Sequence, residues 1–215
     1  QGLFCFDDRK QEFVSLKNDL PDDIRNFVID SKDRIFFLTG HGQLLHYQLT
    51  VRNSCPELSF KEEIRHCAPV SNIYLSQDCL IINDDRTLTV SQDNRILDSI
   101  NIPENKTVSQ AICHGEYLLI SFIEGGCIRY NLENGTSTEL LQLPEKASIF
   151  TIYIGSQNIL WVGTDGQGIL EVYEHSSPFH NVKTNYPVRC FCEEDNGNIL
   201  VGTKGEGILL LDKQE

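Results

Sequence analysis

The sequence predicts an all-β protein, and three observations support this fold class: recurring strand-like runs, a near absence of helical periodicity, and an internal repeat. Short runs rich in Ile, Val, Leu, Phe and Tyr are separated by Gly, Asn and Asp. Several runs are apolar at consecutive positions, which predicts sheets that are covered on both faces. A short helix stays open as an alternative for residues 57–65. The expected strands include residues 24–30, 34–40, 117–123, 149–155, 159–164 and 199–203.

The internal repeat is about forty residues long. The segment NILWVGTDGQGILEVYE (158–174) aligns with NILVGTKGEGILLLDK (198–213), and each copy reads as a strand, a Gly-rich turn and a second strand. Looser copies lie at 34–49 and 117–132. The glycines that open the second of these strands are Gly2, Gly42, Gly125, Gly168 and Gly207, which are 40, 83, 43 and 39 residues apart. The step of 83 covers two repeats, because the missing copy falls at 79–92, where a polar residue replaces the glycine.

Each repeat reads as four strands, which in the fourth complete repeat are 149–155, 159–164, 168–174 and 179–184. A four-stranded sheet cannot bury both of its faces alone, so consecutive sheets stack around an axis as the blades of a β-propeller. We therefore expect one domain over residues 1–215, with about five repeats. It is either a partial propeller or a compact ring, and we favour a fragment of a larger sensor. The expected repeats are 1–17 (a partial blade), 18–62, 63–102, 103–143, 144–184 and 185–215.

Charge and composition exclude several classes of function. The chain has 18 Lys and Arg against 31 Asp and Glu, and the net charge of −13 repels phosphate backbones, so nucleic acid is not an expected partner. It contains no apolar run of about 18 residues, so no membrane span is expected in this segment. The first residues lack the pattern of a signal peptide, and any export signal or anchor is expected outside it.

The cysteines and histidines predict no metal site. Most of the eight cysteines lie in apolar strand-like runs, which favours free, buried thiols, and no CxxC pair is present. Cys190 and Cys192 are two residues apart and face the same side of a strand. The six histidines are scattered, and we interpret them as surface or turn residues. They are His41, His46, His66, His114, His175 and His180.

The repeats resemble those of the two-component regulator propellers. VRCFCEEDNGNILVGTKGEGILLLD (188–212) fits best, IFTIYIGSQNILWVGTDGQGILEVY (149–173) keeps the Trp-x-Gly-Thr, and residues 24–47 keep Asp30. The resemblance implies the periplasmic sensor region of a hybrid two-component histidine kinase, an ectodomain of an inner-membrane protein that often responds to glycan breakdown products. It also implies that further propeller and β-sandwich domains of the same protein are partners.

Ligands of propellers tend to bind at the loops that enter the innermost strands and at the loops between the second and third strands. Here the loops that enter the innermost strands are 20–23, 66–69, 144–148 and 185–187. Sugar recognition needs an aromatic face beside planar hydrogen-bonding groups. Trp161 is expected in blade packing, and the segments 83–86 and 193–198 are expected to be turns. The predicted ligand-binding residues are Arg25, Asp85, Asp165, Tyr186 and Arg189.

These observations favour a ligand-binding sensor that relays its signal to a kinase outside this chain. An oligosaccharide is the expected ligand, and a homodimer is compatible with this interpretation. No nucleophile, base and orienting group can be assembled from the spacing, so we expect neither catalysis nor a cofactor in this segment. Two alternatives stay open: a structural scaffold for protein partners without a small-molecule ligand, and, less favoured, a propeller lyase or glycosidase.

Overall fold

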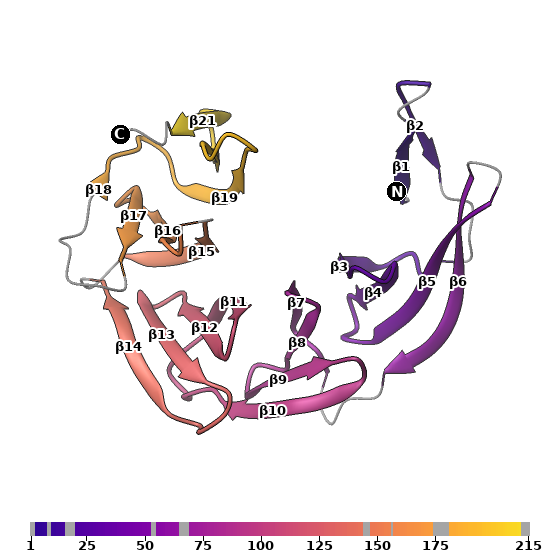
Figure 1. The fold of residues 1–215 in the computed structure, drawn as a ribbon, viewed down its shortest axis with the longest axis horizontal. Coiled ribbons are helices and arrows are strands. Elements are labelled where there is room, and N and C mark those ends of the chain that lie inside the picture. Colours follow the sequence, from indigo (N-terminus) through magenta and orange to yellow (C-terminus); the bar gives the residue numbers. More distant parts are fainter. Residues whose placement is uncertain are drawn as a thin grey trace. The chain divides into compact units, whose positions relative to one another are not determined.

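A computed structural model describes residues 3–7, 10–15, 20–52, 55–64, 69–143, 147–155, 157–173 and 181–211, with the side chains of Arg52, Cys55 and Asn181 left out. Within these residues all regular elements are antiparallel strands and none is a helix (Figure 1). The chain divides into two compact units, Gln1–Ile100 and Asn101–Glu215. The predicted fold class, a β-propeller of four-stranded antiparallel blades, is confirmed. The extent of the domain and the boundaries of its repeats stay predictions.

The first unit contains a hairpin and two blades. The hairpin pairs β1 (Phe4–Asp7) with β2 (Glu12–Ser15). The first blade contains β3 (Ile24–Ile29), β4 (Arg34–Thr39), β5 (Leu44–Arg52) and β6 (Cys55–Ile64). The second blade contains β7 (Asn72–Ser76), β8 (Cys79–Asn83), β9 (Thr87–Gln92) and β10 (Arg95–Asn101).

The second unit contains three blades. The third blade has β11 (Val108–His114), β12 (Tyr117–Phe122), β13 (Gly126–Asn131) and β14 (Ser137–Gln142). The fourth has β15 (Ser148–Ile154), β16 (Leu160–Asp165), β17 (Ile169–Val172) and β18 (Asn181–Val182). The fifth has three strands among the described residues: β19 (Val188–Glu193), β20 (Ile199–Thr203) and β21 (Ile208–Leu211).

The possible helix at 57–65 is wrong for residues 57–64, which belong to β6. This strand pairs with β5 along its full length, from Leu44 opposite Ile64 to Arg52 opposite Cys55. Leu58 lies on the face that packs against the first blade's apolar cluster, and Phe60 stacks edge-on against Tyr47 of β5. Apolar residues two positions apart are typical of a strand, because side chains on a strand alternate between its faces. The long hairpin therefore outweighs the helix-forming charged residues that follow Phe60, which are Lys61, Glu62 and Glu63.

The core lies between neighbouring blades of each unit. Between the third and fourth blades, Leu119 and Cys127 pack against Ile152, Leu160 and Val162 in one buried apolar cluster. The second strands are buried along nearly their whole length, which explains their consecutive apolar residues. Trp161 packs against the buried residues between the fourth and fifth blades, and its predicted role in blade packing is confirmed.

Side-chain hydrogen bonds also join the innermost strands of neighbouring blades. Asn26 Nδ2 of β3 donates to Asn72 Oδ1 of β7 at 2.8 Å. In the second unit, Gln110 Oε1 of β11 accepts a bond from the backbone N–H of Ile152 in β15 at 2.7 Å. Tyr153 Oη of β15 donates to Glu193 Oε2 of β19 at 3.0 Å. These bonds fix the register between blades, which apolar packing alone does not specify.

The repeated Thr and Gly have defined tasks in the turn between the second and third strands. The Thr164 hydroxyl donates to the carbonyl of Gly168 at 2.7 Å and accepts a bond from the N–H of Gln167. Gly168 has a φ of +76°, and a Cβ there would lie 2.4 Å from the carbonyl oxygen of Val182. The glycine is therefore required both by its backbone conformation and by the close approach of the next segment.

Candidate functional site

The five predicted ligand-binding residues lie at equivalent ends of their own blades, where the first strand begins. In the first unit, Arg25 is the second residue of β3, and Asp85 lies in the turn between β8 and β9. In the second unit, Asp165 ends β16, Tyr186 precedes β19 and Arg189 is the second residue of β19. All five are exposed. The antiparallel strand order alone brings these positions to one end of each sheet.

Arg189 and Tyr186 form the aromatic and cationic part of this end in the second unit. The Arg189 guanidinium carbon lies 4.3 Å from the ring centroid of Phe150 in β15, so it bridges the fourth and fifth blades. The Tyr186 ring lies against Gly205, where an added Cβ would be 2.9 Å from two ring carbons. Tyr186 is 42% exposed, so the ring has one supported face and an accessible remainder. This is a suitable platform for the apolar face of a sugar.

Asp165 ends β16, across the sheet from the start of β15. Its Cα partner across the sheet is Ser148. Among the described residues no hydrogen bond or ion pair joins its carboxylate to Arg189. A ligand could therefore meet the carboxylate and the guanidinium as separate acceptor and donor groups.

The two carboxylates in the segment 83–86, those of Asp84 and Asp85, have different roles. Asp84 closes the turn between β8 and β9, because its carboxylate accepts bonds from the N–H of Arg86 and from the N–H and hydroxyl of Thr87. Asp85 has a φ of +71°, and its N–H donates to Asn83 Oδ1 at 3.0 Å. The turn interpretation is confirmed, and it leaves the side chain of Asp85 exposed to solvent.

His46 is an exception to the predicted surface or turn position of the histidines. It lies in mid-strand in β5, is 8% exposed and stacks on Phe36 at 5.0 Å between ring centroids. Its Nδ1 lies 3.4 Å from Glu62 Oε1. The sequence prediction was wrong here because the imidazole packs as an aromatic ring. His41 is exposed in its turn, and His66, His175 and His180 lie outside the described residues.

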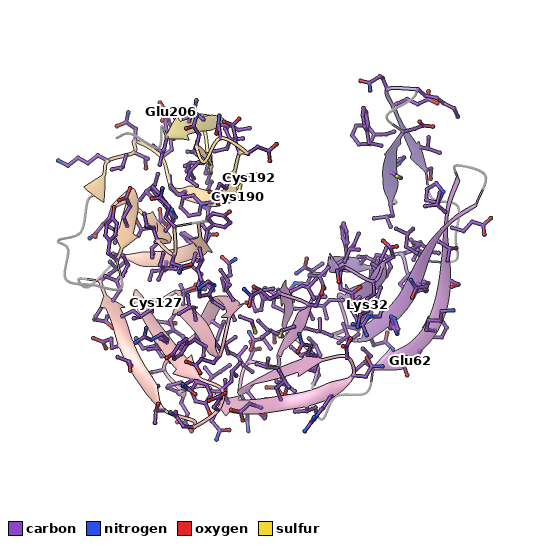
Figure 2. The ribbon with its side chains drawn as sticks, in the orientation of Figure 1. Lys32, Glu62, Cys127, Cys190, Cys192 and Glu206 are labelled. Atoms are coloured by element: carbon purple, nitrogen blue, oxygen red, sulfur yellow. The ribbon has the colours of Figure 1, made fainter. Side chains whose placement is uncertain are left out.

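Apart from Cys5, which is half-buried, the cysteines whose side chains the structure describes are either buried or exposed; Figure 2 labels Cys127, Cys190 and Cys192. Cys79, Cys113 and Cys127 are buried thiols that form no disulfide, and burial raises the pKa of Cys127 to about 12. Cys190 and Cys192 are exposed on one face of β19, so their predicted burial was wrong. The apolar residues around them contribute to the opposite face of the strand. Within the described ranges, no group of three or more His, Cys, Asp or Glu could hold a metal ion.

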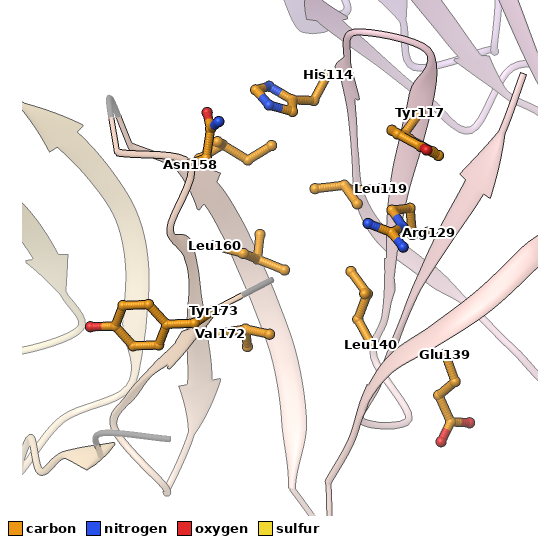
Figure 3. Close-up of a pocket in the computed structure, with 11 residues that line it drawn as sticks. His114, Tyr117, Leu119, Arg129, Glu139, Leu140, Asn158, Leu160, Val172 and Tyr173 are labelled. Atoms are coloured by element: carbon orange, nitrogen blue, oxygen red, sulfur yellow. The ribbon is translucent and has the colours of Figure 1, made fainter. Parts of the chain in front are cut away.

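A cavity of about 150 Å³ lies at the other end of the strands, between the third and fourth blades (Figure 3). Its wall is apolar and continuous with the buried core between these blades. The apolar wall is formed by Leu119, Leu140, Ile154, Leu160 and Val172. His114 and Asn158 face each other at one edge of the cavity. Sequence reasoning missed this site, because its residues come from seven strands, from the turn before β16 and from the position after β17, and they share no motif.

Arg129 is the one cationic side chain among the residues that line the cavity. Its guanidinium carbon lies 4.8 Å from the ring centroid of Tyr117, and Figure 3 shows the guanidinium between Leu119 and Leu140. The carboxylate of Glu139 points away from these two leucines. Bonding to the Glu116 carboxylate raises the pKa of Tyr117, and bonding to Glu171 raises that of Tyr173. Both phenols therefore stay neutral at physiological pH.

The fold and its turns define the class of this chain as a β-propeller. Residues 142–166 match the two component regulator propeller family. The resemblance predicted from the Trp-x-Gly-Thr motif is thereby confirmed, on the repeat that contains Trp161. No curated protein matches the chain by sequence.

Solved structures share the fold at low sequence identity. The extracellular domain of BT4673 from B. thetaiotaomicron, described as a one component system, has a TM-score of 0.73 at 19% identity, over 97% of this chain and 30% of that one. The extracellular domain of BT3049 from the same organism, described as a hybrid two component system, has 0.64 at 15%, over 95% and 30%. Virginiamycin B lyase from Staphylococcus aureus has 0.67 at 12%, over 99% and 77%.

The chain therefore spans about a third of the length of the two extracellular domains that it resembles. No helix among the described residues is long and apolar enough to span a membrane.

Proposed function

We propose that this chain is part of the periplasmic sensor region of a hybrid two-component signalling protein and performs no chemistry itself. The observation that carries the proposal is the match of residues 142–166 to the two component regulator propeller. The two similar structures described as extracellular domains of one component and hybrid two component systems support a location outside the cytoplasm. The signal passes to a histidine kinase outside this chain.

The ligand is an oligosaccharide that binds at the strand ends that carry Tyr186 and Arg189. The supported ring of Tyr186 offers a face to the C–H groups of a sugar, and Arg189 and Asp165 offer planar donor and acceptor groups for its hydroxyls. Arg25 and Asp85 occupy the corresponding ends of their own blades. Net charge disfavours anionic glycans, so a neutral oligosaccharide is the expected class.

Titration of the purified chain with a library of plant and host oligosaccharides tests the proposal. We expect at least one neutral oligosaccharide to bind saturably. Tyr186→Ala removes a stacking surface and Arg189→Gln removes a charged donor. Each substitution is therefore expected to weaken oligosaccharide binding about tenfold or more. Arg95→Gln is the matched control, because Arg95 is an exposed arginine on the outer strand β10.

Two results would contradict the proposal. One is that no oligosaccharide binds, and the other is that Arg95→Gln weakens binding as much as Arg189→Gln does. If the combined substitution of Asp85, Asp165 and Arg189 leaves the kinase response of the parent protein intact, a scaffold for protein partners would be favoured instead.

A further inference from the structure

We propose that the polar edge formed by His114 and Asn158, together with the apolar wall beside it, is a second small-molecule site that binds a compact neutral aromatic alcohol of the phenol class. The site is independent of the glycan proposal, because it lies at the opposite end of the strands. In the fourth blade, Leu160 lines the cavity where β16 begins, whereas Asp165 ends that strand.

The polar edge sets the one polar group of the ligand. His114 ends β11 in the third blade, and Asn158 lies in the turn between β15 and β16 in the fourth, where the two side chains face each other (Figure 3). Neither side chain has a hydrogen-bond partner among the described residues. A neutral imidazole offers one donor and one acceptor, and an amide offers both. A hydroxyl, which donates and accepts, is therefore a small group that both side chains can bind at once.

The apolar wall sets the body of the ligand. The cavity volume is about 150 Å³, and cavities of about this volume lined by aliphatic side chains bind benzene-sized molecules. Leu119, Leu160 and Val172 are each less than a tenth exposed, so they form a surface that water wets poorly. The body of the ligand is therefore about the size of one aromatic ring.

Neither sign of charge dominates the lining, so the ligand is neutral. Arg129 and Glu139 both line the cavity, and Arg129 stacks on Tyr117 and has further interactions of its own. The carboxylates of Glu116 and Glu171 are bonded to the hydroxyls of the two tyrosines in the lining. A charged ligand would lose its hydration against the apolar wall without gaining an unengaged group of opposite charge.

A ligand held in this way contacts two blades at once. Its hydroxyl binds His114 of the third blade and Asn158 of the fourth, and its ring packs against Leu119 of the third and Leu160 of the fourth. These contacts add to those of the apolar cluster between the same two sheets. Binding is therefore expected to raise the thermal unfolding midpoint of the chain.

The test uses phenol as the probe and toluene as its counterpart of similar shape, in which a methyl group replaces the hydroxyl. Both are titrated into the intact chain by NMR, and nuclear Overhauser effects to the methyl groups of Leu160 and Val172 locate the bound ring. We expect both to bind saturably at these methyl groups. Benzoate and benzylamine, which carry charges of opposite sign, should each bind more weakly than phenol.

Substitutions at the polar edge test the recognition of the hydroxyl. His114→Leu and Asn158→Gly should each weaken phenol about tenfold relative to toluene, because each leaves the hydroxyl without one partner. Glycine tolerates the φ of +59° at position 158, so this variant keeps the turn. His41→Leu is the matched control, since His41 is an exposed histidine in the turn between β4 and β5. Unchanged toluene binding shows that each variant is folded.

Three results would overturn the proposal. The first is that phenol does not bind saturably, or binds without contacts to Leu160 and Val172. The second is that benzoate or benzylamine binds as tightly as phenol, which would show that charge selects the ligand. The third is that neither His114→Leu nor Asn158→Gly changes the ratio of phenol to toluene binding, or that His41→Leu changes it as much.

Discussion

At the residue scale, the recurring motif can be explained position by position. The Thr of Gly-Thr bonds to the backbone of the turn that follows, at Thr164 and again at Thr203. The buried carboxylate of Asp30 accepts bonds from the N–H groups of Lys32 and Arg34 and so closes the turn between β3 and β4. These positions of the motif therefore serve to form turns.

Gly168 and Gly207 occupy the same motif position in different surroundings, which gives a matched pair of variants. Both have positive φ, but an added Cβ meets backbone atoms only at Gly168, and at Gly207 nothing lies within 4 Å. Gly207→Ala is expected to lower the free energy of unfolding by about 1 kcal/mol through backbone strain alone. Gly168→Ala adds an overlap and is expected to lower it by about 2–4 kcal/mol. Urea unfolding measures both, and equal effects would contradict the role given to the close approach.

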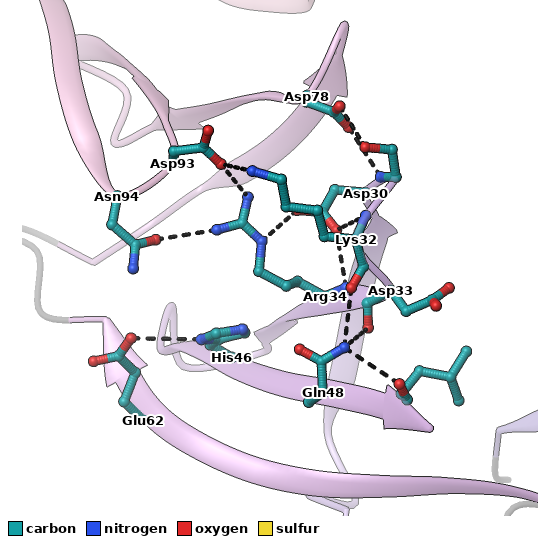
Figure 4. Close-up of polar contacts among 12 residues, drawn as sticks. Asp30, Lys32, Asp33, Arg34, His46, Gln48, Glu62, Asp78, Asp93 and Asn94 are labelled. Atoms are coloured by element: carbon teal, nitrogen blue, oxygen red, sulfur yellow. Dashed lines mark hydrogen bonds and ion pairs between the residues drawn. The ribbon is translucent and has the colours of Figure 1, made fainter. Parts of the chain in front are cut away.

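At the scale of elements, a polar network joins the first and second blades (Figure 4). Asp78, in the turn between β7 and β8, accepts bonds from the N–H and the hydroxyl of Ser31. Asp93, in the turn between β9 and β10, pairs with Lys32 and with Arg34. Three turns are thus linked at one end of the two sheets.

This network predicts a defined dependence of stability on pH. The bonds from Ser31 lower the pKa of Asp78, and the bond from Lys32 lowers that of Asp93, below the ordinary value of 3.8. Because a lowered pKa favours the ionised form in the folded state, the stabilisation is present above this value. It is lost as pH falls through 3.8 and then through the folded pKa.

As the pH falls from about 5 to 3, the free energy of unfolding of the double variant Asp78→Asn, Asp93→Asn should therefore decrease less than that of the parent chain. Urea unfolding across this range measures the slope. The variant Asp22→Asn with Asp195→Asn, at two exposed carboxyls outside the network, is the control. If this control flattens the slope as much, the network is not the cause.

The sequence predicts elements well where their pattern is local, and less well where burial depends on a neighbouring sheet. Strand-like runs such as 117–123 correspond to strands, because consecutive apolar residues are typical of a sheet covered on both faces. Burial of His46 and exposure of Cys190 depend on which face of the strand meets another sheet, and no local pattern records that. The cavity around Arg129 needs two packed blades, so single-repeat reasoning could not find it.

At the scale of the whole molecule, a repeat is one blade, and each blade is stabilised by its neighbours in the same unit. The proposed ligand-binding residues at the strand ends and the cavity at the opposite ends both depend on this stacking. In the proposed sensor, a ligand would act through a small change in the packing between blades. The charge of −13 keeps such a module soluble and away from anionic surfaces.

The central claim, that successive repeats are blades with buried second strands, is tested most directly by amide hydrogen exchange followed by mass spectrometry. Slowest exchange is predicted in β4, β8, β12 and β16, once per repeat, with the outer strands β6, β10 and β14 faster. A single continuous protected region, or protection that does not recur with the repeat, would contradict the account.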